Sequence, residues 1–208
     1  MIAADQPLNY KEAVAYKEWR DAMQTELDAI EKNKTWQLVD LPPGHKAIGL
    51  KWVFKVKKDN LGKVVKHKAR LVAKGFVQKH GIDFDEVFAP VARLDTVRLI
   101  LALAAQHGWV VHHLDVKSAF LNGDLKEEVY VSQPEGYVDK IHSQSQGAKI
   151  FKSSLGLREA PRAWNIRLDK SLKGLGLFKC SEDTAAYKRN SKGKTLLVGV
   201  YVDDLIVI

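Results

Sequence analysis

Apolar side chains recur every three to four residues in three parts of the chain, which is the spacing that places them on one face of an α-helix. This spacing predicts helices over residues 11–32, 95–107 and 161–175. Asp95 is the expected N-cap of the second helix, and Gly108 is its expected stop. We expect the apolar faces of the first two helices to pack in the core.

Alternating apolar and polar positions predict strands instead. Residues 51–57 alternate apolar side chains with lysines, and residues 64–73 form a second β-prone run. The residues between them, Asp59-Asn60-Leu61-Gly62, have the composition of a hairpin turn. Since successive side chains of a strand point to opposite faces, we expect one buried face and one basic face.

The last apolar run, residues 196–208, is interrupted by the adjacent carboxylates Asp203 and Asp204. This pattern favours a strand, a tight turn with the aspartates, and a return strand. Upstream, residues 109–120 hold another β-prone run that ends in Asp115. If the two strands lie side by side, three carboxylates meet at one end of the sheet. For the Asp-Asp pair taken alone, the alternative is a solvated turn.

Carboxylates held close together repel one another and need a compensating charge, which a divalent metal ion supplies. Oxygen ligands suit Mg²⁺, with Mn²⁺ as the alternative. Two ions roughly 3.5–4 Å apart serve the attacking and leaving oxygens of phosphoryl transfer. The pattern therefore indicates metal-dependent phosphoryl transfer at Asp115, Asp203 and Asp204.

Positive charge is concentrated in one part of the chain. The net charge is +8, yet residues 46–79 contain eleven Lys or Arg and one acid, Asp59, so this stretch alone carries +10. Such a basic sector favours a polyanion, because neutralising phosphates releases counterions. The alternative is a solvated lysine-rich hairpin. We favour nucleic acid or a triphosphate, because the charges are expected on one face of a sheet.

Length and composition exclude several other classes. The 208 residues suffice for one large domain or two small ones. The single cysteine, Cys180, excludes an internal disulfide and fits a reducing compartment. No apolar run approaches the roughly 20 residues of a membrane helix, and the N-terminus lacks the pattern of a signal peptide. The histidines are irregularly spaced without a cysteine partner, so no zinc site is predicted.

The chain resembles the reverse transcriptases of copia-type LTR retrotransposons. The resemblance rests on Tyr201-Val202-Asp203-Asp204 together with residues 51–57, 68–76, 81–91, 114–123 and 160–164. These blocks occur in the family's order and cover nearly the whole chain. The YVDD sequence alone is a weak signal, whereas the ordered set is very specific.

The resemblance implies an α+β fold with mainly antiparallel sheets, the fingers and palm of a right-hand polymerase. Residues 1–44 are expected to form an N-terminal helix and a connecting segment, and residues 45–208 the fingers and palm. We expect the chain to be truncated after the YVDD hairpin, without thumb or RNase H, so that missing segments are needed for a firm grip. The return strand is then expected to be unpaired on its outer edge.

The implied activity is RNA-directed DNA polymerisation with two Mg²⁺ ions. The primer 3′-hydroxyl attacks the α-phosphorus of a dNTP, and pyrophosphate leaves. The partners are an RNA template, a DNA primer and a dNTP, with no membrane. The implied location is intracellular, in a cytoplasmic virus-like particle.

The resemblance also assigns roles to individual residues. Asp115 and Asp203 are the principal metal ligands, and Asp204 assists. Phe120 takes the position of an aromatic sugar gate that rejects ribose, the alternative being an ordinary core phenylalanine. The remaining assignments are Tyr201 and Val202 at the primer end, Lys57, Lys58 and Arg70 at the triphosphate, and Arg162 along phosphates.

Two positions depart from the family pattern. Leu155 replaces an aromatic residue, and Glu159 replaces a glutamine that lies near the sugar of the incoming nucleotide. A carboxylate facing a triphosphate is electrostatically unfavourable, so Glu159 is expected to weaken nucleotide binding. Three hypotheses follow: a catalytic core fragment that is impaired alone, a non-catalytic nucleic-acid-binding remnant, and another metal-dependent enzyme such as a nuclease.

Overall fold

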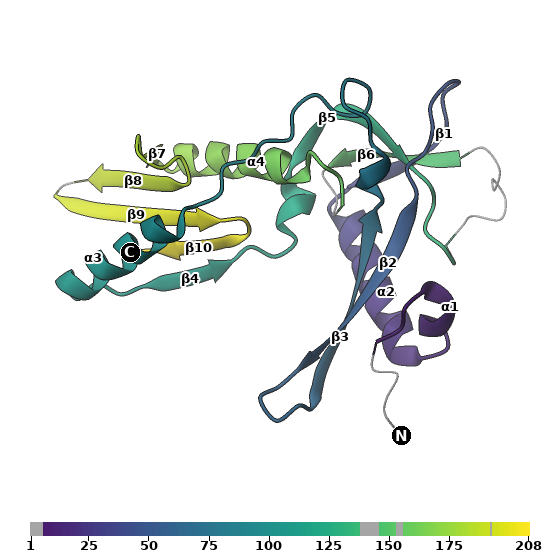
Figure 1. Cartoon of the computed structure of the whole chain (residues 1–208), viewed down its shortest axis with the longest axis horizontal. Coiled ribbons are helices and arrows are strands. Elements are labelled where there is room, and N and C mark those ends of the chain that lie inside the picture. Colours follow the sequence, from purple (N-terminus) through teal and green to yellow (C-terminus); the bar gives the residue numbers. More distant parts are fainter. Residues whose placement is uncertain (1–5, 138–145, 153–155, 192) are drawn as a thin grey trace. The chain divides into compact units, whose positions relative to one another are not determined.

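The computed structural model describes residues 6–137, 146–152, 156–191 and 193–208 (Figure 1). Leu155 and most of the polar stretch 138–147 lie outside the described residues. The chain divides into two compact units. Unit 1 comprises residues 1–86 and 124–160, and unit 2 comprises residues 87–123 and 161–208. Each unit is therefore built from two separate stretches of sequence.

Unit 1 combines two helices with two small antiparallel sheets. Its elements are α1 (Tyr10–Ala13), α2 (Lys17–Lys32), β1 (Trp36–Asp40), β2 (Leu50–Lys58), β3 (Val64–Ala73), β5 (Asp124–Val131) and β6 (Gln146–Lys152). The strand orders are β1-β6-β5 and β2-β3. All of these strand ladders are antiparallel.

The first predicted helix is divided into α1 and α2. The Asn9 side chain caps α1 by accepting a hydrogen bond from the Glu12 N–H, and Tyr16 is extended before α2. The Arg20 guanidinium donates to the Val14 carbonyl at 2.7 Å, which satisfies a backbone acceptor at the break. The prediction of one continuous helix over residues 11–32 was therefore wrong at residues 14–16.

The hairpin of β2 and β3 packs against α2 as the alternation predicts. Trp52 and Phe54 stand opposite Leu71 and Ala69, and all four side chains are buried. Trp19 of α2 meets Phe54 edge-on, with 5.3 Å between ring centroids. At the turn, the Asp59 carboxylate accepts hydrogen bonds from the N–H groups of residues 61 and 63. The predicted hairpin and its buried face are confirmed.

Unit 2 is a five-stranded antiparallel sheet with two long helices. Its elements are α3 (Leu94–His107), β4 (His112–Asp115), α4 (Ala160–Gly174), β7 (Phe178–Lys179), β8 (Ala186–Ser191), β9 (Lys194–Tyr201) and β10 (Asp204–Val207). The first residue of α4, Ala160, is assigned to unit 1, and the rest of the helix to unit 2. The strand order is β4-β10-β9-β8-β7. Because β4 pairs with β10 on the side away from β9, the expectation of an unpaired outer edge at the return strand was wrong.

The sheet of unit 2 lies between its two helices. From α4, Trp164, Leu168 and Leu172 pack with Val198, Val200 and Leu205. From α3, Ile100 and Ala104 pack with Leu197, Ile206 and Ile208. Since odd and even positions of a strand face opposite ways, α3 and α4 cover opposite faces. The site residues of β4 and β10 can therefore be assigned to a face by register.

The start of α3 differs from the prediction. Asp95 lies inside the first turn, and no side chain of the N-cap residue, Arg93, forms a capping bond. Asp183 accepts instead, from the Thr96 hydroxyl at 2.6 Å and from the Arg93 N–H at 3.4 Å. These bonds and that of Ala185 N–H hold the pKa of Asp183 below its usual range although burial opposes them. Gly108 ends the helix at φ +66°, as predicted.

The architecture is mixed α and β with antiparallel sheets, in agreement with the predicted class at that level. Among the residues that the structure describes, no helix has the length and apolarity needed to cross a bilayer.

Candidate active site

The turn between β9 and β10 consists of Val202 and Asp203. Val202 has φ +57°, which is uncommon for a β-branched residue and is sustained only where neighbours fix the backbone. One such neighbour is Trp164 of α4, whose indole N–H donates to the Val202 carbonyl at 2.7 Å. Trp164 is buried, so this bond holds the turn from beneath.

Strand register brings the predicted carboxylates to one edge of unit 2. Asp204 stands opposite Asp115 of β4 on one side and opposite Tyr201 of β9 on the other. Directly opposed residues share a face, so Tyr201, Asp204 and Asp115 form one row on the α3 side. The Val116 N–H donates to the Asp203 carbonyl at 2.9 Å and extends the pairing into the turn. Strand pairing thus brings the backbone positions of Asp115, Asp203 and Asp204 close to one another.

The three carboxylates differ in accessibility and partners. Asp115 is exposed, while Asp203 and Asp204 are partly exposed. The Asp204 Oδ1 lies 2.8 Å from the Nε2 of His113, two residues before Asp115. Solvent therefore reaches all three carboxylates, and one of them already has a side-chain partner.

The chemistry of this set fits a hard divalent cation, because carboxylate oxygens are the ligands that Mg²⁺ and Mn²⁺ take. Asp115, Asp203 and Asp204 would hold it. Within the described ranges, however, no three His, Cys, Asp or Glu side chains are grouped closely enough to hold one ion. The backbone arrangement is suited to a metal, and the side chains would have to turn toward a common point to bind it.

Phe120 follows Asp115 by five residues, and Arg162 lies between Asp115 and Asp203 in the sequence. Phe120 belongs to a short 3₁₀ turn, Ala119–Asn122, and is partly buried against the core beneath α4. This packing agrees with the alternative of a core phenylalanine and leaves its gate role a prediction. Arg162 is in the first turn of α4 and is partly exposed.

In unit 1, the face of the β2–β3 hairpin away from α2 forms a basic surface. It contains Lys51, Lys55, Lys57, Lys66, Lys68, Arg70 and the half-exposed Val53, and we call it the basic face. The pairs Lys55–Lys68 and Lys57–Lys66 are directly opposite. Lys57 and Arg70 therefore share this face, while Lys58 follows a register shift near the turn.

Like charges placed opposite each other repel. Partial burial lowers the pKa of Lys68, and the neighbouring charges of Arg70, Lys57 and Lys66 lower it further, against an opposing effect of Glu26. Binding of an anion to such a surface is favourable, because it neutralises the repelling charges. The geometry therefore supports the predicted affinity of this hairpin for polyanions.

Glu159 belongs to a buried hydrogen-bond network of unit 1. Its side chain is only 2% exposed, and the Gln78 amide donates to both carboxyl oxygens, at 3.2 and 3.0 Å. The Gln78 carbonyl accepts from the Arg158 N–H at 2.9 Å, and the Arg158 Nε donates to the Gly75 carbonyl at 3.1 Å. Burial raises the pKa of Glu159 above its ordinary value, although the Gln78 bond works against this. The carboxyl group is thus enclosed by protein.

Replacing Glu159 by Gln is expected to stabilise unit 1 at neutral pH by about 1 kcal/mol, because a neutral amide avoids the cost of a buried charge. A raised folded-state pKa means that wild-type stability is complete at acidic pH and falls as pH rises through that pKa. The gain should therefore shrink towards pH 4. Urea denaturation at several pH values measures it.

Glu128→Gln is the matched control in the same unit. The hydrogen bond from Lys149 lowers the pKa of the exposed Glu128. The pH dependence is therefore opposite to that of Glu159, because the stability that Glu128 contributes is present at neutral pH and is lost in acid. This variant should be no more stable than wild type at pH 7. Equal pH profiles for the two variants would contradict the buried position of Glu159.

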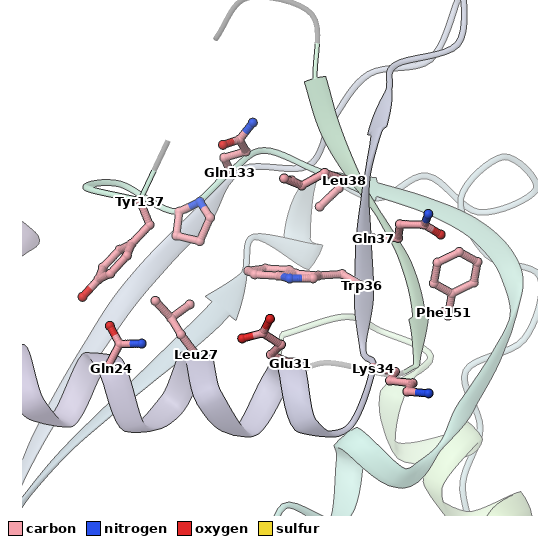
Figure 2. Close-up of a pocket in the computed structure, with 12 residues that line it drawn as sticks. Gln24, Leu27, Glu31, Lys34, Trp36, Gln37, Leu38, Gln133, Tyr137 and Phe151 are labelled. Carbon is pink, nitrogen blue, oxygen red and sulfur yellow. The ribbon is translucent and has the colours of Figure 1, made fainter. Parts of the chain in front are cut away.

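A cavity of about 1090 Å³ lies in unit 1 and is lined by α2, the first residues of β1, residues 133–137 and β6. Figure 2 shows Trp36 extending from β1 into this hollow, above Leu27 and Glu31 of α2. None of the residues that the sequence singles out lines it. The sequence therefore assigns no role to this cavity.

Three contacts of the site escaped prediction from sequence. No individual role was predicted for Trp164, His113 or Gln78. Strand alternation was the available signal for His113, because it places this residue on the face of Asp115. Nothing local indicated that the Trp164 indole reaches Val202 or that Gln78 pairs with Glu159.

Comparison with known proteins gives one consistent result. Residues 33–208 match the family model for reverse transcriptase (RNA-dependent DNA polymerase). The chain is 44% identical over 207 residues to a retrovirus-related Pol polyprotein from transposon TNT 1-94 of Nicotiana tabacum, which covers 98% of this chain and 16% of that protein.

Two further relatives agree. A Pol polyprotein from transposon RE1 of Arabidopsis thaliana is 37% identical over 208 residues, 100% of this chain and 14% of that protein. The transposon Ty1-LR2 Gag-Pol polyprotein of Saccharomyces cerevisiae is 26% identical, over 96% of this chain and 11% of its own length. The chain thus spans 16% or less of the length of these three relatives.

Proposed function

Because this chain belongs to the copia-type reverse transcriptases, a family of RNA-dependent DNA polymerases, we propose that it provides the catalytic carboxylates for RNA-directed DNA synthesis. The observation that carries the proposal is the register that sets Asp204 opposite Asp115, with Asp203 in the adjoining turn. Residues 89 positions apart thereby lie on neighbouring strands. This arrangement supports the metal-ligand roles that the family resemblance assigns.

The proposed reaction is nucleotidyl transfer. The primer 3′-oxygen forms a bond to the α-phosphorus of a dNTP, the bond to pyrophosphate breaks, and the hydroxyl proton is released. Reverse transcriptases generally use divalent metal ions, and here we propose two Mg²⁺. Ions bound at this site would lower the pKa of the 3′-hydroxyl and neutralise charge on the leaving group.

The protein's own part is to position groups. Asp115 and Asp203 act as the principal ligands, and Asp204 assists. The Trp164 bond keeps the turn in its conformation, so that Asp203 does not have to be ordered during each cycle. Tyr201 and Val202 adjoin the carboxylates on β9 and in the turn, which supports their proposed place at the primer end.

The basic face supplies phosphate contacts in the proposal. Lys57, Lys58 and Arg70 remain the candidates for the triphosphate, and Arg162 for the nucleic-acid backbone. The buried position of Glu159 supports a structural role for its carboxyl group, and its expected effect on nucleotide binding stays a prediction. The fingers and palm assignment, and the division at residue 44, stay predictions.

Extension of a DNA primer on an RNA template in the presence of Mg²⁺ tests the proposal. Template-directed extension would support it. Binding of primer-template by folded protein without extension would favour the second candidate, a non-catalytic nucleic-acid-binding protein, for which the basic face is the specific observation. Strand cleavage would indicate a nuclease instead.

Replacing Lys57 and Lys66 together by Gln is expected to weaken nucleic-acid binding equally for all sequences. The slope of log affinity against log salt should fall by about two, because each phosphate contact contributes roughly one. Fluorescence anisotropy of a labelled RNA–DNA hybrid between 50 and 200 mM salt measures this slope. The control replaces Lys17 and Lys32, two exposed lysines of α2, by Gln. An equal change in both double variants would contradict a localised basic face.

A further inference from the structure

One histidine touches the carboxylate cluster directly. The His113 Nε2 lies 2.8 Å from the Asp204 Oδ1, and both side chains keep access to solvent, at 66% and 43% exposure. A carboxylate only accepts hydrogen bonds, so Nε2 carries a hydrogen and donates a hydrogen bond to Oδ1. This bond engages one of the two oxygens of Asp204.

The face of β4 explains why His113 and not His112 makes this contact. His113 stands opposite Ile206 and His112 opposite Val207, so the two histidines point to opposite sides of the sheet. Asp204 and Ile206 share the α3 side with Asp115 and His113. His112 belongs to the side where Val207 packs beneath α4. The chain therefore contains two adjacent histidines, of which one faces the carboxylates.

We propose that His113 is a positioning residue for the metal-binding carboxylates: its Nε2–H holds Asp204 Oδ1 on the side of the sheet that carries Asp115, and so limits the orientations of the Asp204 carboxylate when the three carboxylates turn toward an ion. This inference rests on the proposed function. A partner that orients a ligating carboxylate typically changes metal affinity or activity by 10- to 100-fold when it is removed. Because both His113 and Asp204 are accessible to solvent, we expect the effect of removing His113 to lie near the lower end of that range.

This role differs from that of an ordinary surface pair. Exposed ion pairs contribute little to folding, so loss of the bond should leave stability nearly unchanged. Its effect should appear in the geometry of Asp204, and hence in the affinity for the ion. Metal affinity measured on the intact chain, without substrate, separates the two roles.

The test compares His113→Leu, His113→Gln and His112→Leu. Mn²⁺ serves as the probe, and free Mn²⁺ is counted by electron paramagnetic resonance during titration of the full chain. His113→Leu is expected to weaken Mn²⁺ binding about 10-fold, and His113→Gln should recover much of the loss because its amide also donates. His112→Leu should bind as wild type does. All variants are first compared by urea denaturation.

Two measurements identify the source of any failure. The ¹⁵N and ¹H shifts of the His113 ring should change in Asp204→Asn more than those of His112, which reports the bond without any metal. If wild type binds Mn²⁺, Asp203→Asn does not, and His113→Leu equals wild type, the positioning role is overturned while the proposed function stands. If Asp203→Asn binds as wild type does, the carboxylates are not the metal site, and both proposals fail.

Discussion

Primer extension should be abolished when Asp203 is replaced by Asn. The two side chains have nearly the same shape, and asparagine is well tolerated in turns, so the fold should persist. What is lost is the negative charge that the proposed metal site requires. Since the metal ions supply several kcal/mol to phosphoryl transfer, we expect a fall of about a thousand-fold or more in the rate of extension.

The measurement is Mg²⁺-dependent extension of a labelled DNA primer on an RNA template, with wild type and variant at equal concentration. Asp115→Asn should behave in the same way, because Asp115 stands opposite Asp204 on the neighbouring strand. Asp95→Asn is the matched control, since Asp95 is highly exposed on α3 and pairs with Arg98. Undiminished extension by folded Asp203→Asn protein would refute the catalytic assignment.

Replacing Gly75 by Ala should destabilise unit 1 by about 3 kcal/mol or more, a cost at the upper end of overpacking. A Cβ at this position would lie 1.9 Å from the Gly156 carbonyl oxygen and 2.8 Å from the Gln78 Oε1. The first of these neighbours is backbone and cannot move aside as a flexible side chain does. The segment that follows β3 would have to separate from residues 156–159.

Urea denaturation followed by circular dichroism measures this loss, and hydrogen exchange of β3 locates it. Gly174→Ala is the control, because the space around Gly174 in α4 is open and alanine favours helices. That variant should be equal to wild type or slightly more stable. Similar stabilities for the two variants would show that the close approach of Gly75 and Gly156 does not exist in solution.

Local sequence patterns were sufficient for most elements. The alternation of Trp52, Phe54 and Val56 with lysines specified β2, its basic face and its buried face before any tertiary contact was known. The helices α3 and α4 lie within one residue of their predicted bounds. These features depend on spacing within a single segment, which the sequence displays directly.

The break between α1 and α2 is a local feature that was not predicted. Other unpredicted features depend on residues distant in sequence. The cap of α3 comes from Asp183, almost ninety positions away from its first turn. The hydrogen bonds between Glu159 and Gln78 join residues 81 positions apart. For the carboxylates, the metal-dependent chemistry inferred from Asp115 and the Asp203-Asp204 pair stays a prediction. Their register could not be predicted, because a shift by one residue would reverse every side chain.

The order of strands in unit 2 also has a consequence for biosynthesis. The strand that ends in Asp115 pairs only with β10 among the described strands, and β10 is made about ninety residues later. Chains grow from the N-terminus at a few residues per second, and distant pairings close slowly. During translation, β4 therefore lacks this partner until β10 leaves the ribosome. The pairing that sets Asp204 opposite Asp115 then forms late, and a nascent chain that stops before residue 204 does not contain it.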